Sequence, residues 1–209
     1  MPIAAENAAL DAAAPAWQVV RMSQDPIAFA DHAALLAWLD IHATTQAELW
    51  VLIWKKDSGV PSVTWDDCVR AALAHGWIDG IGKSIDEKSW KQRLTPRKPR
   101  GSWSARNVGI AGELIAEGRM RPAGLAQVTA AQADGRWQAA YAGPKDHAVP
   151  DDFLAAVASD PVAAATYAGL NRQNQFAIYY RLHTARTPET RARRMAKLLA
   201  TLAAGQKIV

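Results

Sequence analysis

The feature of this sequence that most constrains its fold is a change in the spacing of its apolar residues. The run ELWVLIWKK at residues 48–56 is β-branched and aromatic and ends at Asp57-Ser58-Gly59, which predicts a strand. Apolar residues separated by polar breaks at residues 77–95 predict two strands of a meander, and Pro96 and Pro99 end them because proline cannot donate to a ladder. After Pro150 the apolar residues recur at helical spacing. We therefore predict an α+β fold, with a small, mostly antiparallel sheet at residues 48–96, flanking helices and an all-helical C-terminal region.

Capping residues, prolines and glycines mark the expected helix ends. Asp25-Pro26 has the order of an N-cap and a first helical residue, and Thr64-Trp65-Asp66-Asp67 resembles a capping box. Further starts are predicted at Ser102 or Ser104, Pro122, Asp160-Pro161 and Thr187-Pro188. The expected organisation is a disordered arm at 1–25, an α+β domain at 26–144, and a helical region at 150–209 packed on that domain.

The N-terminus and the single cysteine bear on where the protein resides. Residues 1–16 are alanine-rich but contain Glu6 and Asp11 and lack an early Lys or Arg, so they do not read as a signal peptide. No apolar stretch reaches the ~18 residues that span a bilayer, so we expect no stable membrane insertion. Cys68 allows no intramolecular disulfide, which fits a reducing compartment. The predicted location is the cytoplasm.

Three patterns that could signal catalysis or metal binding are weak. Gly80-Ile81-Gly82-Lys83-Ser84 ends like a phosphate-binding loop, but Trp77 occupies the position of the first glycine, so the glycines are expected to serve turns with positive φ. Cys68 and His75 are seven residues apart on one helix, about 10 Å, too far for a nucleophile and its base. The five histidines have no zinc-type spacing, so neither a metal nor a cofactor is predicted.

Charge is distributed unevenly along the chain. Residues 1–82 carry 4 basic and 10 acidic side chains, whereas residues 83–209 carry 20 basic and 10 acidic ones. The densest stretch has eight basic residues against Asp86 and Glu87: Lys83, Lys88, Lys91, Arg93, Arg97, Lys98, Arg100 and Arg106. Trp90 and Trp103 are interleaved with them, a combination that suits binding of an anion or a ring, and equally suits a basic turn over a tryptophan core.

Asp79 lies in a predicted strand directly after Trp77 and Ile78. An internal contact, such as a salt bridge to Lys83 or Arg93 or a turn hydrogen bond, is one reading of this carboxylate, and a catalytic role is the other.

Several motifs resemble a known family. Gly76-Trp77-Ile78-Asp79-Gly80, Leu94 to Arg100 and Trp103 to Asn107 are similar, in order, to motifs of the YdeI/OmpD-associated family, also called bacteriocin-protection proteins. The segments at 118–120, 122–125 and 135–141 and the tail from Arg181 to Arg194 continue the resemblance, which covers nearly everything after Pro26. The resemblance implies a role in survival against cationic antimicrobial peptides and bacteriocins in association with a porin, and it implies no catalytic residues.

The sequence thus predicts a non-enzymatic stress-protection protein that binds an anionic or aromatic ligand, with a protein partner as a further option. The predicted ligand-binding residues are Trp77, Asp79, Lys83, Arg93, Arg97, Trp103, Asn107 and Arg136. Trp77 is expected to be mainly structural and Trp103 partly exposed. One alternative is an enzyme with Asp79 as general base and Arg97 or Lys83 as an electrostatic clamp. Another is a weak, non-specific nucleic-acid binder that uses the basic stretch and the arginine-rich last helix.

Overall fold

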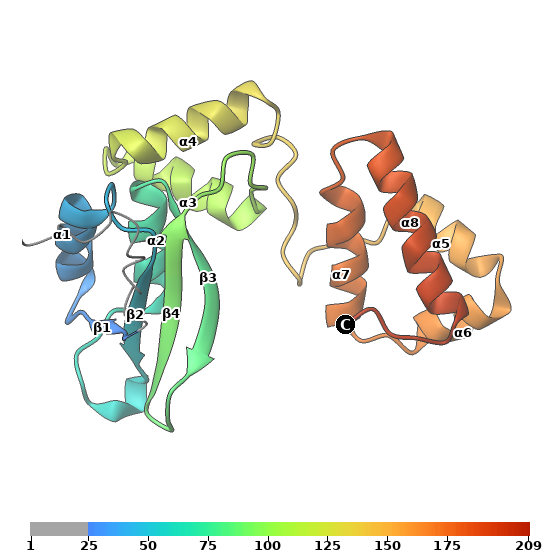
Figure 1. Ribbon diagram of the computed structural model, residues 1–209, viewed down its shortest axis with the longest axis horizontal. Coiled ribbons are helices and arrows are strands. Elements are labelled where there is room, and N and C mark those ends of the chain that lie inside the picture. The colour runs from blue at the N-terminus through green and yellow to red at the C-terminus, as the bar shows by residue number, and fades with distance from the viewer. Residues whose placement is uncertain (1–24) are drawn as a thin grey trace, which may run out of the picture.

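The computed structural model describes residues 25–209, which form two regions joined by an extended connection (Figure 1). The sheet region contains β1 (Ile27–Ala28), α1 (His32–His42), β2 (Leu49–Trp54), a 3-10 turn (Lys56–Ser58), α2 (Trp65–Ala74), β3 (Trp77–Ser84), β4 (Ser89–Pro96), α3 (Ala105–Ala116) and α4 (Pro122–Ala133). The helical region contains α5 (Asp151–Ala158), α6 (Pro161–Ala168), α7 (Arg172–His183) and α8 (Pro188–Ala203). The predicted α+β class is confirmed, whereas the domain boundaries stay a prediction. The predicted arm, apart from Asp25, lies outside the described residues.

The sheet has the strand order β1-β2-β4-β3. β4 pairs antiparallel with both β2 and β3, as the meander predicts, and β1 adds a short parallel edge through Ile27 and Ala28. The helix start predicted at Asp25-Pro26 is wrong, because this segment enters the sheet instead. Asp31 caps α1, and its Oδ1 accepts a hydrogen bond from the Ala34 amide at 2.8 Å.

The predicted capping box of α2 is confirmed. Thr64 Oγ1 accepts from the Asp67 amide at 3.1 Å, and Asp67 Oδ2 accepts from the Thr64 amide at 2.8 Å. The helix ends before Gly76, whose φ of +75° few other residues adopt. α4 crosses α2 so closely that a Cβ on Gly124 would lie 2.4 Å from the Ala74 carbonyl oxygen. Close backbone packing therefore joins α2, which packs on the sheet, to α4.

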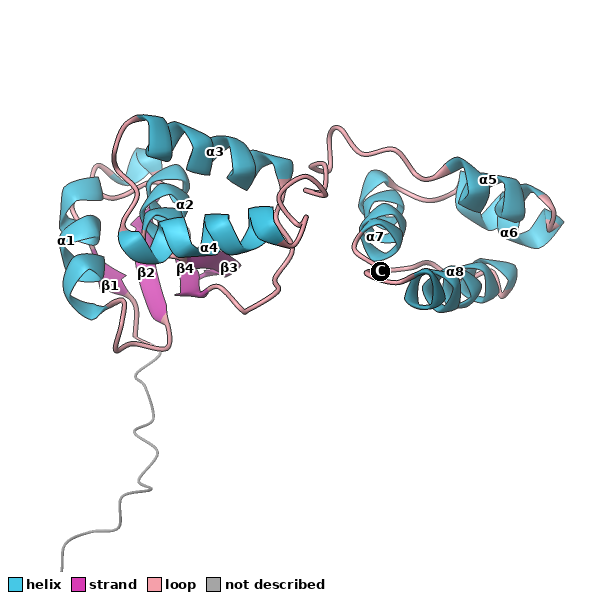
Figure 2. Cartoon of the chain, turned by 90° about the horizontal axis from the view of Figure 1, so that it is seen from above, coloured by secondary structure: helices cyan, strands magenta, loops and turns pink. Residues whose placement is uncertain are grey.

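The two faces of the sheet differ. Alternation along β2 places Leu49, Val51 and Ile53 in a core with residues of α1 and α2, which lie on one side of the strands (Figure 2). Trp50 points to the opposite face, where the ammonium groups of Lys83 and Lys91 lie 5.3 and 4.8 Å from its ring centre. A second core lies between α2, α3 and α4 and includes Trp103.

The helical region has its own core, formed by aliphatic side chains and Phe153. α8 packs on α5, α6 and α7, and the predicted apolar stripe of this helix supplies Leu198 and Leu202. The cap-then-proline starts at Asp160 and Thr187 are confirmed, since both side chains accept amide hydrogen bonds. None of the helices between residues 25 and 209 has the length and apolar character to cross a membrane.

Candidate anion-binding site at the junction of the two regions

The eight predicted ligand-binding residues do not form one site. Trp77 lies in the core between the sheet and α1 and α2, and Asp79 lies beside Trp65. Lys83 and Arg93 lie on the other face of the sheet, the face of Trp50, which we call the open sheet face. The remaining four residues lie between the end of β4, the start of α3 and the connection after α4: Arg97, Trp103, Asn107 and Arg136. The structure brings Arg97, Trp103 and Arg136 together, and we call these three residues the arginine–tryptophan corner.

Trp77 is structural, as predicted. It is 2% exposed, and its indole Nε1 donates to the Ala43 carbonyl at 3.2 Å. Asp79 accepts a hydrogen bond from Trp65 Nε1 at 3.2 Å, so the carboxylate makes an internal contact, but with neither Lys83 nor Arg93. The reason is the register: a bulge between Asp79 and Gly82 interrupts the alternation of β3, and Lys83 is directed to the Trp50 face.

Lys83 and Arg93 lie on the open sheet face, away from the arginine–tryptophan corner. Arg93 Nε pairs with Glu48 Oε2 at 2.6 Å, and Lys83 lies over Trp50. Gly80 and Gly82 do not have the positive φ that was expected, because both belong to β3. A Cβ on Gly82 would lie 3.0 Å from Trp90 Cζ3, so close side-chain approach explains this glycine instead.

Arg97 stacks on Trp103. The guanidinium carbon lies 3.8 Å from the indole centre, and Nη2 donates to the Ser102 carbonyl at 2.9 Å. The turn between them is tight: Arg100 has a φ of +65°, and the Gly101 amide donates to the Lys98 carbonyl. This turn places the Trp103 ring against Arg97 from one side, while Trp137 meets the indole edge to face at 5.0 Å.

Trp103 is not partly exposed as predicted: only 1% of its surface is accessible. The Gly101-Ser102 segment before it suggested an exposed turn. However, the indole packs in the core between α2, α3 and α4, and Trp137 lies against it. The Trp103 carbonyl also accepts from the Tyr141 amide at 2.9 Å, which fixes the connection after α4 beside this residue.

Two donors in the corner are buried and have no partner among the described residues: Arg97 Nη1 and Trp103 Nε1. Buried polar atoms in native proteins nearly always have a hydrogen-bond partner, so orphaned donors point to an acceptor supplied from outside the chain. Burial, and next the charge of Arg136, lowers the pKa of Arg97 to about 10, although Tyr141 and Asp79 oppose the shift. The guanidinium is therefore desolvated and close to a second cation, and it forms no ion pair with any residue between 25 and 209.

Arg136 is the third residue of the corner, and it also lines a cavity. Its Nε pairs with Asp134 at 2.7 Å, and its Nη1 donates to the Gly101 carbonyl at 2.9 Å. Beside it lies a cavity of about 420 Å³, the junction cavity, whose lining includes Trp103, Arg136, His183 and Arg186. Both regions thus contribute to its walls, and Asp134 is the only carboxylate among its lining residues.

A few polar contacts fix the helical region at this junction. Arg186 Nη2 donates to the Arg100 carbonyl at 2.8 Å, and His183 Nε2 lies 3.0 Å from the Ala139 carbonyl. The Tyr141 and Tyr180 rings meet edge to face at 4.9 Å. Burial, the largest cause, raises the pKa of Tyr141. The junction is polar, and it brings arginines from both regions to the same place.

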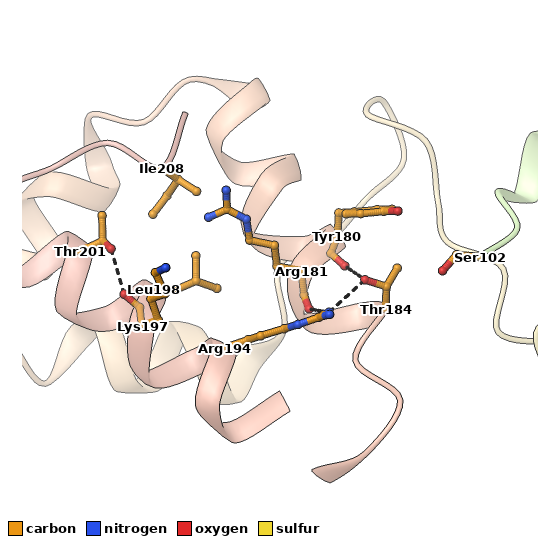
Figure 3. A pocket seen from close by; sticks show the side chains of 9 residues that line it. All are labelled: Ser102, Tyr180, Arg181, Thr184, Arg194, Lys197, Leu198, Thr201 and Ile208. Atoms are coloured by element: carbon orange, nitrogen blue, oxygen red, sulfur yellow. Dashed lines mark hydrogen bonds between the residues drawn. The ribbon is translucent and has the colours of Figure 1, made fainter. Parts of the chain in front are cut away.

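A larger cavity of about 700 Å³ adjoins the junction, since Ser102 and Thr184 line both (Figure 3). We call it the basic cavity, because Arg181 from α7 and Arg194 and Lys197 from α8 line it. From the sequence we did not predict a small-ligand site at these residues. Their spacing is a usable signal: positions 194, 197, 198 and 201 share one face of a helix, and three of these four residues are polar.

Neither a reactive thiol nor a metal cluster emerges from the described residues. Cys68 is fully buried in the core, and burial raises the pKa of its thiol to about 12. Within residues 25–209 no three His, Cys, Asp or Glu side chains are arranged to hold a metal ion. The chemistry available at the junction is therefore that of arginine, lysine, hydroxyl and aromatic groups.

Comparison with known protein families divides the chain at the same junction. Residues 27–127 match the model of a domain of unknown function (DUF8412), and residues 146–205 match the model described as bacteriocin-protection, YdeI or OmpD-associated. No curated protein and no solved structure matched the chain. Of the motifs that carried the resemblance, those between 76 and 125 fall in the first match and Arg181 to Arg194 fall in the second. The chain thus carries, through residues 146–205, a domain of the YdeI/OmpD-associated, bacteriocin-protection family.

Proposed function

We propose that this protein is a non-enzymatic stress-protection protein that binds an anionic ligand at the arginine–tryptophan corner. The observation that carries the proposal is the buried Arg97 guanidinium, stacked on Trp103, whose Nη1 has no acceptor among the described residues. A planar guanidinium presents its outer donors in a fixed fork that fits carboxylate or phosphate oxygens. The cytoplasm is the proposed location.

An anion at this corner would relieve two unfavourable features. Arg97 and Arg136 repel each other, and that repulsion adds to the burial that lowers the pKa of Arg97. A bound oxyanion would lie between the two positive charges and accept the orphaned hydrogen bond. The half-buried indole of Trp137, which packs edge to face on Trp103, offers ring surface to an aromatic anion.

The distribution of charge favours a small anion over the rival ligands. A junction lined by arginines repels cationic peptides, so protection would not operate by direct capture of such peptides at this site. The basic stretch at residues 83–106 is divided, since Lys83 lies on the sheet face, Arg97 is buried and Arg106 stacks on Trp65 at 4.1 Å. A nucleic acid needs a continuous basic track. Asp79 accepts a hydrogen bond from Trp65 Nε1 at 3.2 Å, and this contact accounts for the carboxylate without a role as a general base.

The proposal is tested by titrating the protein with inorganic phosphate and with phenyl phosphate while tryptophan fluorescence is recorded. We expect quenching that saturates, because Trp103 and Trp137 border the site. Arg97→Met and Arg136→Met should each weaken binding by about tenfold or more, the size of one lost charge-assisted hydrogen bond.

Arg119→Met is the matched control. Arg119 is also an arginine paired with a nearby carboxylate, Glu117, but it lies outside the arginine–tryptophan corner. Its replacement should leave binding within about twofold of the wild type. Equal losses in all three variants, or no saturable quenching by either anion, would show that the corner is only a structural arginine stack.

A further inference from the structure

The basic cavity in the helical region has cations without carboxylate partners. Arg181 and Lys197 form no ion pair within the described part of the chain, and no Asp or Glu lines the cavity. Arg194 is held in place, because its Nη1 donates to the Arg181 carbonyl at 2.7 Å and to Thr184 Oγ1 at 3.3 Å. Three positive charges therefore surround one space, and at least two of them are free to bind an anion.

The same cavity also has an apolar side. Leu198 forms part of its floor, and Ile208 from the C-terminal tail reaches in beside Arg181 (Figure 3). The tail is fixed there because Asn174 Oδ1 accepts from the amides of Ile208 and Val209 at 2.8 and 3.0 Å. Ile208 is thus a defined part of the wall.

A third cavity, of about 310 Å³, extends this apolar side. Phe176, Ala177 and Val209 line it, and it shares Tyr180 and Arg181 with the basic cavity. Val209 is 60% exposed and Tyr180 is 38% exposed, so both are accessible to a ligand. Arg181 stands at the boundary, with cations on one side and aromatic and aliphatic surface on the other.

We propose that the helical region binds an amphipathic anion. Its phosphate, or a similar oxyanion, would contact Arg181, Arg194 and Lys197, and its alkyl or aryl part would lie along Tyr180, Phe176 and Val209. A ligand with both parts uses both cavities, whereas inorganic phosphate or a neutral chain uses only one of them. This site uses no residue of the arginine–tryptophan corner, so it stands independently of the proposal made above.

The experiment is calorimetric titration of the full chain with four probes. Monomeric dodecyl phosphate should bind at least about tenfold more tightly than inorganic phosphate and than dodecyl maltoside, since each of these lacks one half of the recognition. The fourth probe, vesicles made of phosphatidylglycerol and phosphatidylcholine together, distinguishes a membrane lipid from a free amphiphile as the ligand. Binding to them at comparable affinity assigns the site to a lipid headgroup, and absence of such binding assigns it to a free amphiphile.

Variants distinguish this site from a non-specific basic surface. Arg181→Met combined with Lys197→Met should weaken dodecyl phosphate binding about tenfold or more, whereas Arg193→Met, on the same helix but outside the cavity lining, should change it less than about twofold. Arg97→Met should keep full dodecyl phosphate binding in the helical region even though it weakens anion binding at the corner about tenfold or more. Binding of inorganic phosphate or of dodecyl maltoside as tight as that of dodecyl phosphate, or an equal loss with Arg193→Met, would overturn the inference.

Discussion

The sheet region buries several polar side chains, whereas the helical region leaves nearly all of its polar side chains at least partly exposed to solvent. In the sheet region His75, Gln92, Arg97 and Asn107 are buried, and Arg97 is held by a stacked ring and a carbonyl. In the helical region, which is described in full, Asn174 is the one buried polar side chain, and the cations of its cavity stand at the surface. A buried charge has a fixed position and a desolvation cost, whereas an exposed cation keeps its hydration and moves freely. The first arrangement suits a selective site, and the second suits a ligand of variable shape.

The comparison is tested most strongly by Trp103→Ala. Because the ring is 1% exposed and supports Arg97, we expect a loss of about 3–5 kcal/mol in the free energy of unfolding. Trp65→Ala is the control, since that ring is 41% exposed, and it should cost less than about 1.5 kcal/mol. Denaturant unfolding measures both. Similar losses in the two variants would contradict the buried corner.

In the helical region the largest effect of a polar substitution should come from Asn174→Ala. Its Oδ1 accepts from two backbone amides of the C-terminal tail, and removing it leaves both without this acceptor. We expect a loss of about 1–3 kcal/mol and faster hydrogen exchange at residues 208 and 209. Exchange measured by mass spectrometry with unchanged tail protection would show that the tail is held by other contacts.

The desolvation of Arg97 predicts a pH dependence with a definite sign. Its folded pKa of about 10 lies below the ordinary value of 12.5, so between these values the unfolded chain binds more protons. The wild type should therefore gain stability relative to Arg97→Met above pH 10, by about 1.4 kcal/mol per pH unit at most. Below pH 10 the difference between the two proteins should be constant. A difference that stays flat from pH 9 to 11 would refute the lowered pKa.

At neutral pH, Arg97→Met itself should change stability little. Methionine keeps the contact with Trp103 and removes a desolvated charge, and replacing buried ions by apolar groups of similar volume is often neutral or stabilising. We expect a free energy of unfolding within about 1 kcal/mol of the wild type, or above it, together with loss of anion binding at the corner. A loss above about 3 kcal/mol would mark Arg97 as a structural residue.

The smallest effect is expected from Arg181→Ala and Lys197→Ala. Both side chains are exposed and lack ion pairs in the described chain, so each change should stay within about 0.5 kcal/mol of the wild type. Thermal unfolding without ligand measures this. A larger loss in either variant would show that the cations of the helical region are also structural, and the contrast between the two regions would disappear.

Most elements follow from the sequence because their signals are local. The capping box at Thr64 and the cap-then-proline starts at Asp160 and Thr187 concern residues within one helical turn. The strand at residues 49–54 follows from its own composition, and the resemblance to the bacteriocin-protection family is confirmed by residues 146–205. The start of α1 was misplaced because the pairing of Ile27 with Val51 involves a partner 24 positions away.

The sequence by itself thus determined the α+β class, the helix caps at Thr64, Asp160 and Thr187, the buried Trp77, and the resemblance of residues 146–205 to the bacteriocin-protection family. Only the tertiary structure decided that Trp103 is buried, that Arg97 stacks on it, and that Lys83 and Arg93 belong to another face. The physical reason is that each of these facts depends on long-range contacts: residues of α2, α3 and α4 pack around Trp103, and the bulge in β3 redirects Lys83. The same holds for the basic cavity, whose three cations lie on two helices and become neighbours only when α7 packs on α8.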